Sequence, residues 1–107
     1  MSDAGGEQGV RAVEARVRAV EARVRGRVQG VGFRWFVARE ARALSLTGWV
    51  RNAPDGTVDV AVVGAPDQVE RMLSALRRGP PHAVVQSVEV EERASHEGMN
   101  LAFEILP

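Results

Sequence analysis

Residues 22–37 read ARVRGRVQGVGFRWFV, and their hydrophobic period changes halfway along. Up to Val28, small and apolar residues alternate with polar ones, which is the period of a β-strand. From Phe33 onward the apolar spacing becomes three and four, the period of a helix with one buried face. Gly30 and Gly32 lie between the two patterns, so we predict a sharp turn from strand to helix there.

The rest of the chain continues this alternation of strands and helices. We predict strands over residues 47–52 and 57–63, joined by a turn whose Pro54 and Gly56 are typical hairpin residues. A second helix opens at Pro66 and stops before Gly79, and strands follow over residues 84–92 and 101–105. This order predicts an α+β, ferredoxin-like two-layer sandwich, β-α-β-β-α-β plus a short terminal strand. Its sheet is expected to be antiparallel, with both helices on one face.

The N-terminal residues do not fit this pattern. Residues 1–10 are polar and glycine-rich, and the heptad RAVEARV then occurs twice, at 11–17 and 18–24. Two heptads are too few for a dependable coiled coil, and the second copy runs directly into the first strand. We therefore divide the chain into an N-terminal extension over 1–20, disordered or partly helical, and a domain over 21–107 whose first strand begins near Glu21.

Composition excludes several chemistries. The 107 residues include no Cys and no Lys, which excludes thiolate metal sites, cysteine nucleophiles and Schiff-base lysines. Only His82 and His96 carry imidazoles, so a multi-histidine metal site is also excluded. Both histidines stand among loop-forming residues, and we expect them on surface loops.

The charges are unevenly distributed along a chain whose net charge is zero. The first 51 residues hold ten Arg against five acidic residues, and the other 56 hold four Arg against nine. We expect the two halves to interleave in the fold, so that the charges offset one another. No apolar run approaches the roughly 20 residues of a membrane span, and the N-terminus lacks a secretory pattern. We expect a cytoplasmic protein with no membrane partner.

The segment from Gly26 to Arg34 is the candidate site. A glycine turn that opens a helix directs successive backbone N–H groups into a concavity that suits a tetrahedral oxyanion. Arg34 adds a planar guanidinium that can bind two oxygens of a phosphate, although a cation in the first helical turn is unfavourable to the helix dipole. The glycines could equally serve only the tight connection, and Arg34 alone could be a solvated surface residue.

Three other residues invite two interpretations each. Asn52 ends a strand just before the predicted turn, where it could serve the chemistry or cap the turn. Trp35 and Trp49 could be stacking platforms for a ligand, but partial burial in the core is commoner for tryptophan.

In combination these segments are far more specific. The run GRVQGVGFR at 26–34, followed by TGWVRN at 47–52, closely resembles the acylphosphatase family. Further matches are PDGTV at 54–58, GPP at 79–81, VEV at 88–90 and FEI at 103–105, so that the resemblance covers about residues 21–107. It implies hydrolysis of acyl phosphates to a carboxylate and inorganic phosphate, without a metal or an organic cofactor.

The resemblance also implies roles for individual residues. Arg34 and Asn52 are the expected catalytic residues, with Asn52 orienting the attacking water. The expected phosphate-binding residues are Gln29, Gly30, Val31, Gly32, Phe33 and Arg34.

Two other functions are considered. Similar domains stand at the N-terminus of hydrogenase-maturation carbamoyltransferases, where this chain would be a non-catalytic or carrier-type domain that binds a carbamoyl or acyl phosphate. The end of the sequence at Pro107, without zinc-finger or transferase segments, favours a free-standing enzyme. We also expect a monomer. RNA-recognition domains share the architecture, but they stack bases on aromatic residues of central strands, and residues 23–28 and 57–63 contain none. We therefore expect no nucleic-acid partner.

Overall fold

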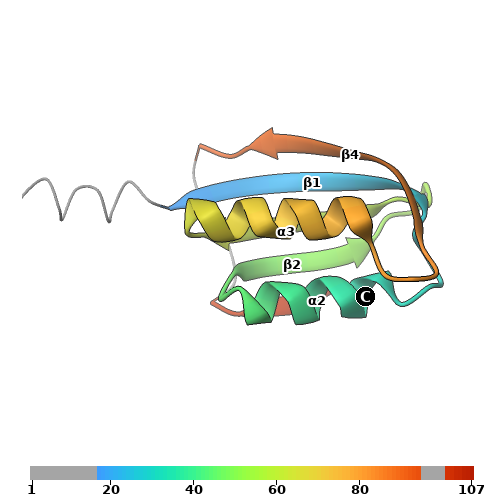
Figure 1. Cartoon of the computed structure of the whole chain (residues 1–107), viewed down its shortest axis with the longest axis horizontal. Coiled ribbons are helices and arrows are strands. Elements are labelled where there is room, and N and C mark those ends of the chain that lie inside the picture. Colours follow the sequence, from blue (N-terminus) through green and yellow to red (C-terminus); the bar gives the residue numbers. More distant parts are fainter. Residues whose placement is uncertain (1–16, 95–100) are drawn as a thin grey trace, which may run out of the picture.

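The computed structural model describes residues 17–94 and 101–107. Two helices lie side by side on one face of a sheet, which confirms the predicted two-layer sandwich (Figure 1). The elements are β1 (Arg18–Arg27), α2 (Phe33–Ala43), β2 (Thr47–Asn52), β3 (Val58–Gly64), α3 (Pro66–Arg78), β4 (Val84–Glu92) and β5 (Phe103–Ile105). Residues 1–16, which hold the predicted tail and most of the first heptad, lie outside the described residues, as does His96.

The five strands form one sheet in the order β4-β1-β3-β2-β5. The pairs β1–β3, β1–β4 and β2–β3 are antiparallel, but β5 runs parallel to β2, so the prediction of an antiparallel sheet is wrong for the last strand. The reason is the end at which the chain leaves β4. Arg93 donates its N–H to Ala19 O, close to the start of β1, and β2 starts at that same end of the sheet. A chain that enters β5 from there must run in the direction of β2.

Strand β1 begins three residues earlier than the predicted start near Glu21. Ala19 pairs with Val63 and Val20 with Val62, and both residues are buried. Ladder hydrogen bonds and burial therefore draw the start of the second heptad into the sheet, against its helical spacing. At the other end of the chain, Leu101 is exposed and precedes β5 rather than belonging to it.

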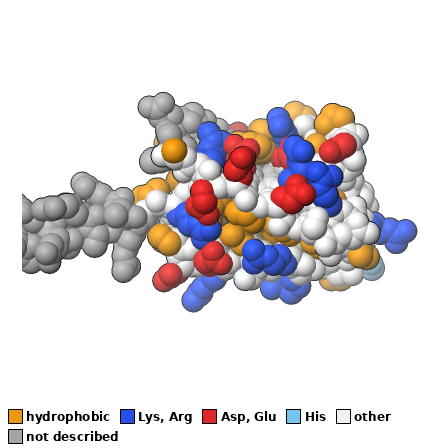
Figure 2. All heavy atoms as spheres, turned by 90° about the horizontal axis from the view of Figure 1, so that it is seen from above, with side chains coloured by type: hydrophobic (Ala, Val, Ile, Leu, Met, Phe, Trp, Pro, Cys, Tyr) orange, Lys and Arg blue, Asp and Glu red, His pale blue; other side chains and the backbone are white. Residues whose placement is uncertain are grey.

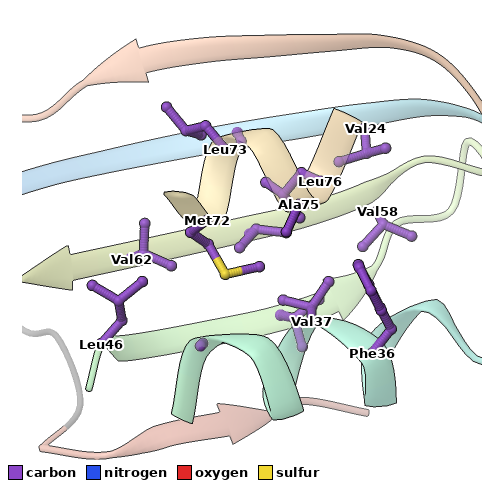
Figure 3. Packing of buried hydrophobic residues seen from close by; sticks show 14 of the residues in the cluster. Val24, Phe36, Val37, Leu46, Val58, Val62, Met72, Leu73, Ala75 and Leu76 are labelled. Carbon is purple, nitrogen blue, oxygen red and sulfur yellow. The ribbon is translucent and has the colours of Figure 1, made fainter. Parts of the chain in front are cut away.

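The core lies between the helices and the sheet. Met72 and Leu76 from α3 and Phe36 from α2 point toward valines of the inner sheet face, such as Val58 (Figure 3). Helix α3 begins at Pro66 and ends at Arg78, directly before Gly79, as its sequence predicts, and Gly79 has a positive φ of 68° that glycine adopts without strain. Buried side chains of α2 belong to the same core cluster as those of α3 and the sheet, which fixes the position of α2. The candidate site lies at the N-terminus of α2.

The uneven charges of the two halves are brought together, as predicted. Arg18 forms ion pairs with Glu70 and Glu92, and Arg25 forms one with Glu89. Arginine and acidic side chains are accordingly interspersed on the face of the molecule that Figure 2 shows. These pairs join the first half of the sequence to the second, so this face carries no single-sign patch.

Candidate active site

The connection between β1 and α2 has the predicted sharp turn. Gly30 and Gly32 have φ angles of 76° and 79°, a region that side chains strongly disfavour, and Gly32 is the N-cap of α2. The two glycines thus allow the strand to turn directly into the helix. The carbonyl of Gly32 accepts the N–H of Phe36 at 3.0 Å and so opens the helical ladder.

In the part of the chain that the structure describes, no side-chain hydrogen bond caps the N-terminus of α2, and the first turn contains no acidic residue. The N–H groups of Phe33, Arg34 and Trp35 precede the first helical hydrogen bond, so they cannot have acceptors within the helix. Four backbone donors together with the positive end of the helix dipole form a ready site for an anion, counting the N–H of Gly32.

Arg34 is directed toward the C-terminal segment. Its Nη1 donates a hydrogen bond to Leu106 O at 3.0 Å, and the side chain is half-buried. The N–H of Leu106 in turn donates to Val50 O at 2.8 Å. The marker for the C-terminus in Figure 1 accordingly lies beside the N-terminal end of α2. One acceptor occupies one edge of the guanidinium and orients it, which leaves its other N–H groups for a ligand.

Gln29 ties the glycine turn to the β2–β3 hairpin. Its Nε2 donates to Ala53 O and to Thr57 O, both at 2.8 Å. Both hydrogens of the side-chain amide are therefore used within the protein. The prediction that Gln29 binds phosphate now concerns its backbone N–H alone, because its side chain positions the two loops relative to each other.

Asn52 lies between these two sets of bonds. It is the last residue of β2, half-buried, and on the same face of the sheet as Val50, which faces the helices. One residue after Asn52, the carbonyl of Ala53 accepts from Gln29. Two residues before Asn52, the carbonyl of Val50 accepts the N–H of Leu106, the residue whose own carbonyl accepts from Arg34. The glycine turn, Arg34 and Asn52 are thus brought to one end of the molecule by hydrogen bonds between segments far apart in the sequence.

The hairpin loop next to Asn52 is fixed by Asp55. Its Oδ1 accepts hydrogen bonds from the hydroxyl of Thr57 at 2.6 Å and from the N–H of Thr57 at 3.1 Å. These bonds lower the pKa of the Asp55 carboxyl, with the hydroxyl contributing most. Since Thr57 O also accepts from Gln29, Asp55 supports the same junction.

The other predicted residues are distributed as follows. Val31 is half-buried, and the ring of Phe33 is buried edge-on against Phe36, so that Phe33 can offer only its backbone to a ligand. His82 is exposed in the loop before β4, as predicted. Trp49 is half-buried but lies on the outer face of the sheet, where its ring is under Arg51 at 5.0 Å, so the prediction of partial burial in the core is correct only in the degree of burial.

That prediction is wrong for Trp35, which is 71% exposed. The helical spacing contains the signal for this. Trp35 lies about 200° around α2 from the buried Phe33, on the opposite side of the helix. The roles of Leu106 O and of the Gln29 side chain, by contrast, depend on contacts across 72 and 24 to 28 residues of sequence, and no local pattern announces them.

The sequence matches the acylphosphatase family over residues 20–105. An acylphosphatase from Thermococcus kodakarensis is 53% identical over 78 residues, which cover 71% of this chain and 86% of that relative. Among solved structures, the crystal structure of acylphosphatase from Bacillus subtilis superposes with a TM-score of 0.80 at 38% identity, covering 84% of this chain and all but 1% of that one.

A larger protein contains a similar unit. The crystal structure of full-length HypF in the phosphate- and nucleotide-bound form matches with a TM-score of 0.76 and 30% identity over 85% of this chain, but only 12% of HypF is covered. Identity is thus higher with the proteins named acylphosphatase than with HypF.

Proposed function

This chain belongs to the acylphosphatase family and is an acylphosphate hydrolase, and we propose that its turnover rests on an anion site at the N-terminus of α2 and on a water held by Asn52. The substrate is a small acyl phosphate, a mixed anhydride of a carboxylic acid and phosphate. Water attacks phosphorus, the bond from phosphorus to the bridging oxygen breaks, and the products are a carboxylate and inorganic phosphate. The higher identity with named acylphosphatases than with HypF disfavours a carrier role.

The phosphate is bound by the backbone N–H groups of residues 29–34 and by the guanidinium of Arg34. Support comes from the N-terminus of α2, which among the described residues has neither a side-chain cap nor a first-turn acid and so leaves the N–H groups of Gly32, Phe33 and Arg34 to an external anion. A loose transition state spreads negative charge over the three equatorial oxygens, so fixed donors around the phosphate stabilise it with little reorganisation.

Asn52 positions the attacking water. Its amide is neutral and cannot act as a base, but it can accept from and donate to one water molecule. Acyl phosphates have a good leaving group, so orientation in line with the scissile bond is sufficient, and the water proton passes to a phosphate oxygen. The observation that carries this assignment is the bonding around Asn52, with Gln29 holding Ala53 and Leu106 holding Val50.

Leu106 O and Gln29 are positioning residues in this scheme. The carbonyl of Leu106 holds one edge of the Arg34 guanidinium at 3.0 Å, and Gln29 holds the hairpin that follows Asn52. Neither is required to touch the substrate. Both reduce the number of conformations that the reacting groups can adopt before the substrate binds.

We also propose that the protein acts as a cytoplasmic monomer without a nucleic-acid partner. In the part of the chain that the structure describes, neither helix is long and apolar enough to span a bilayer. The strands β1 and β3, at the centre of the sheet, contain no aromatic residue on which a base could stack. Size-exclusion chromatography coupled to light scattering tests the oligomeric state.

The test is hydrolysis of benzoyl phosphate by purified protein with a chelator present. Asn52→Ala should lose about 10²–10³-fold in kcat, the usual effect of removing one fixed donor at such a site. Arg34→Ala should lose more, because a charged phosphate ligand disappears. Arg39→Ala is the matched control, since it removes an exposed cation from the same helix and should keep wild-type turnover. Near-wild-type turnover by Asn52→Ala would overturn the role of the water-holding amide.

A further inference from the structure

Trp35 is a large apolar side chain in an unusual place. It lies in the first turn of α2, directly after Arg34, and 71% of its surface is exposed. The phenylalanines at positions 33 and 36, on either side of Arg34 and Trp35, are 2% and 7% exposed. The first turn of α2 therefore places one aromatic ring on the solvent side next to the residues that bind phosphate.

The direction of the helix points this ring toward the anion site. Side chains of an α-helix lean toward its N-terminus, so the indole covers the surface in front of Trp35 rather than behind it. The glycine turn lies at this end of α2, directly before its first residue. A methyl group added at Gly30 or Gly32 would meet no atom within 4 Å, so the turn leaves open space there. Gly30 and Gly32 have no side chains that could stand between the ring and a bound phosphate.

The ring has no aromatic or cationic partner among residues 17–94 and 101–107. Phe33 and Phe36 contact each other, and the ring of Trp49 lies under Arg51. Trp35 takes part in neither contact. Most of the indole surface is thus exposed, and the free energy of covering it is available to a ligand.

From this arrangement we propose that Trp35 binds the acyl group of the substrate and favours acyl phosphates with an aromatic or bulky apolar acyl group. The inference rests on the proposed function. When the phosphate is held by the amides of the glycine turn and by Arg34, the acyl group must extend outward from the concavity. In benzoyl phosphate two atoms, the bridging oxygen and the carbonyl carbon, separate phosphorus from the phenyl ring, which brings that ring to the border where Trp35 lies. Acetyl phosphate has only a methyl group to offer there.

The first test compares kcat/KM for benzoyl phosphate and acetyl phosphate in wild type and in Trp35→Ala. The ratio of the two values should fall by about three- to tenfold in the variant, the usual size of one aromatic contact. Trp35→Phe should retain most of the ratio because it keeps an aromatic face. Trp49→Phe is the matched control, since it changes the other tryptophan, on the outer face of the sheet, and should keep the wild-type ratio.

The two claims fail differently in this experiment. If wild type hydrolyses neither substrate, the proposed function fails. If wild type hydrolyses both and Trp35→Ala leaves the ratio unchanged, the inference on Trp35 is overturned while the function stands. A change of oligomeric state in Trp35→Ala with an unchanged ratio would also overturn it, because the ring would then serve contact between copies of the chain.

A binding measurement reports on the ring directly. In Trp49→Phe, Trp35 is the only indole of the 107-residue chain, since the sequence has two tryptophans. The probes are phenacylphosphonate and acetonylphosphonate, in which a methylene group replaces the bridging oxygen. Phenacylphosphonate should bind several-fold more tightly and shift the emission to shorter wavelength, whereas acetonylphosphonate and inorganic phosphate should leave the emission nearly unchanged. Equal spectra and equal affinities for the two phosphonates would overturn the proposal.

Discussion

Gln29→Glu tests the junction between the glycine turn and the hairpin with an almost isosteric change. The wild-type Nε2 donates two hydrogen bonds of 2.8 Å, to Ala53 O and Thr57 O, in a partly buried position. A carboxylate has no hydrogen to donate, so it would place negative charge against two carbonyl oxygens. Both bonds would be replaced by repulsion.

The magnitude follows from the two bonds. A neutral hydrogen bond contributes about 1 kcal/mol net, so Gln29→Ala should cost about 2 kcal/mol of the free energy of unfolding. Gln29→Glu should cost more at pH 7, because a partly buried charge remains without a donor. For a domain of this size, 2 kcal/mol corresponds to a decrease in Tm of about 8–16 °C.

The assay combines thermal unfolding with inhibition by inorganic phosphate. Both variants should be less stable than wild type, and their kcat should fall because the residue after Asn52 is no longer held. If the Gln29 side chain instead contacted phosphate, Gln29→Ala would weaken phosphate inhibition and leave Tm near the wild-type value. That result, or a Gln29→Glu protein as stable as wild type at pH 7, would refute the positioning role.

Further variants examine other parts of the molecule. Arg34→Lys should lose most of the turnover at unchanged Tm, because an ammonium group cannot bind both Leu106 O and two phosphate oxygens as the planar guanidinium does. Steady-state kinetics measures the loss, and a kcat near the wild-type value would contradict this prediction. Asp55→Asn should flatten the acid limb of stability. The pKa of Asp55 is lower in the folded state, so its contribution to stability is complete above the unfolded pKa of about 3.9 and is lost as pH falls through the folded pKa. The assay is urea unfolding between pH 6 and 2. If the free energies of unfolding of variant and wild type ran parallel over this range, the role of Asp55 would be wrong. Leu76→Ala should cost about 2–5 kcal/mol, because its side chain is fully buried between α3 and the sheet, and denaturant unfolding with a loss below 1 kcal/mol would argue against that packing.

Local patterns were sufficient for most of the fold. Hydrophobic period, proline and glycine located both helices and the four long strands, because each of these signals acts within a few residues. The direction of β5 was predicted wrongly, since alternation in three residues marks a strand but carries no information about its neighbour. The early start of β1 was missed because pairing with Val62 and Val63 outweighed the heptad spacing.

Some features of the candidate site could be predicted from the sequence, and others depend on contacts in the folded chain. Gly30, Gly32 and Arg34 follow from the local turn, and the family resemblance supplied Asn52. The acceptor of Arg34 is Leu106 O, and the donor to Ala53 O is Gln29, so both depend on how distant segments meet in the folded chain. The exposure of Trp35 could have been predicted from its angle on the helix, opposite Phe33.

A crystal structure of the protein soaked with inorganic phosphate tests the anion site most directly. The ion should lie on the backbone N–H groups of residues 30–34, with the Arg34 guanidinium within hydrogen-bonding distance of it and still bonded to Leu106 O. The side-chain amide of Asn52 should face the same ion across a single water molecule. An ion bound elsewhere on the surface, or an Asn52 amide turned away from an ion at α2, would contradict the proposed hydrolytic site.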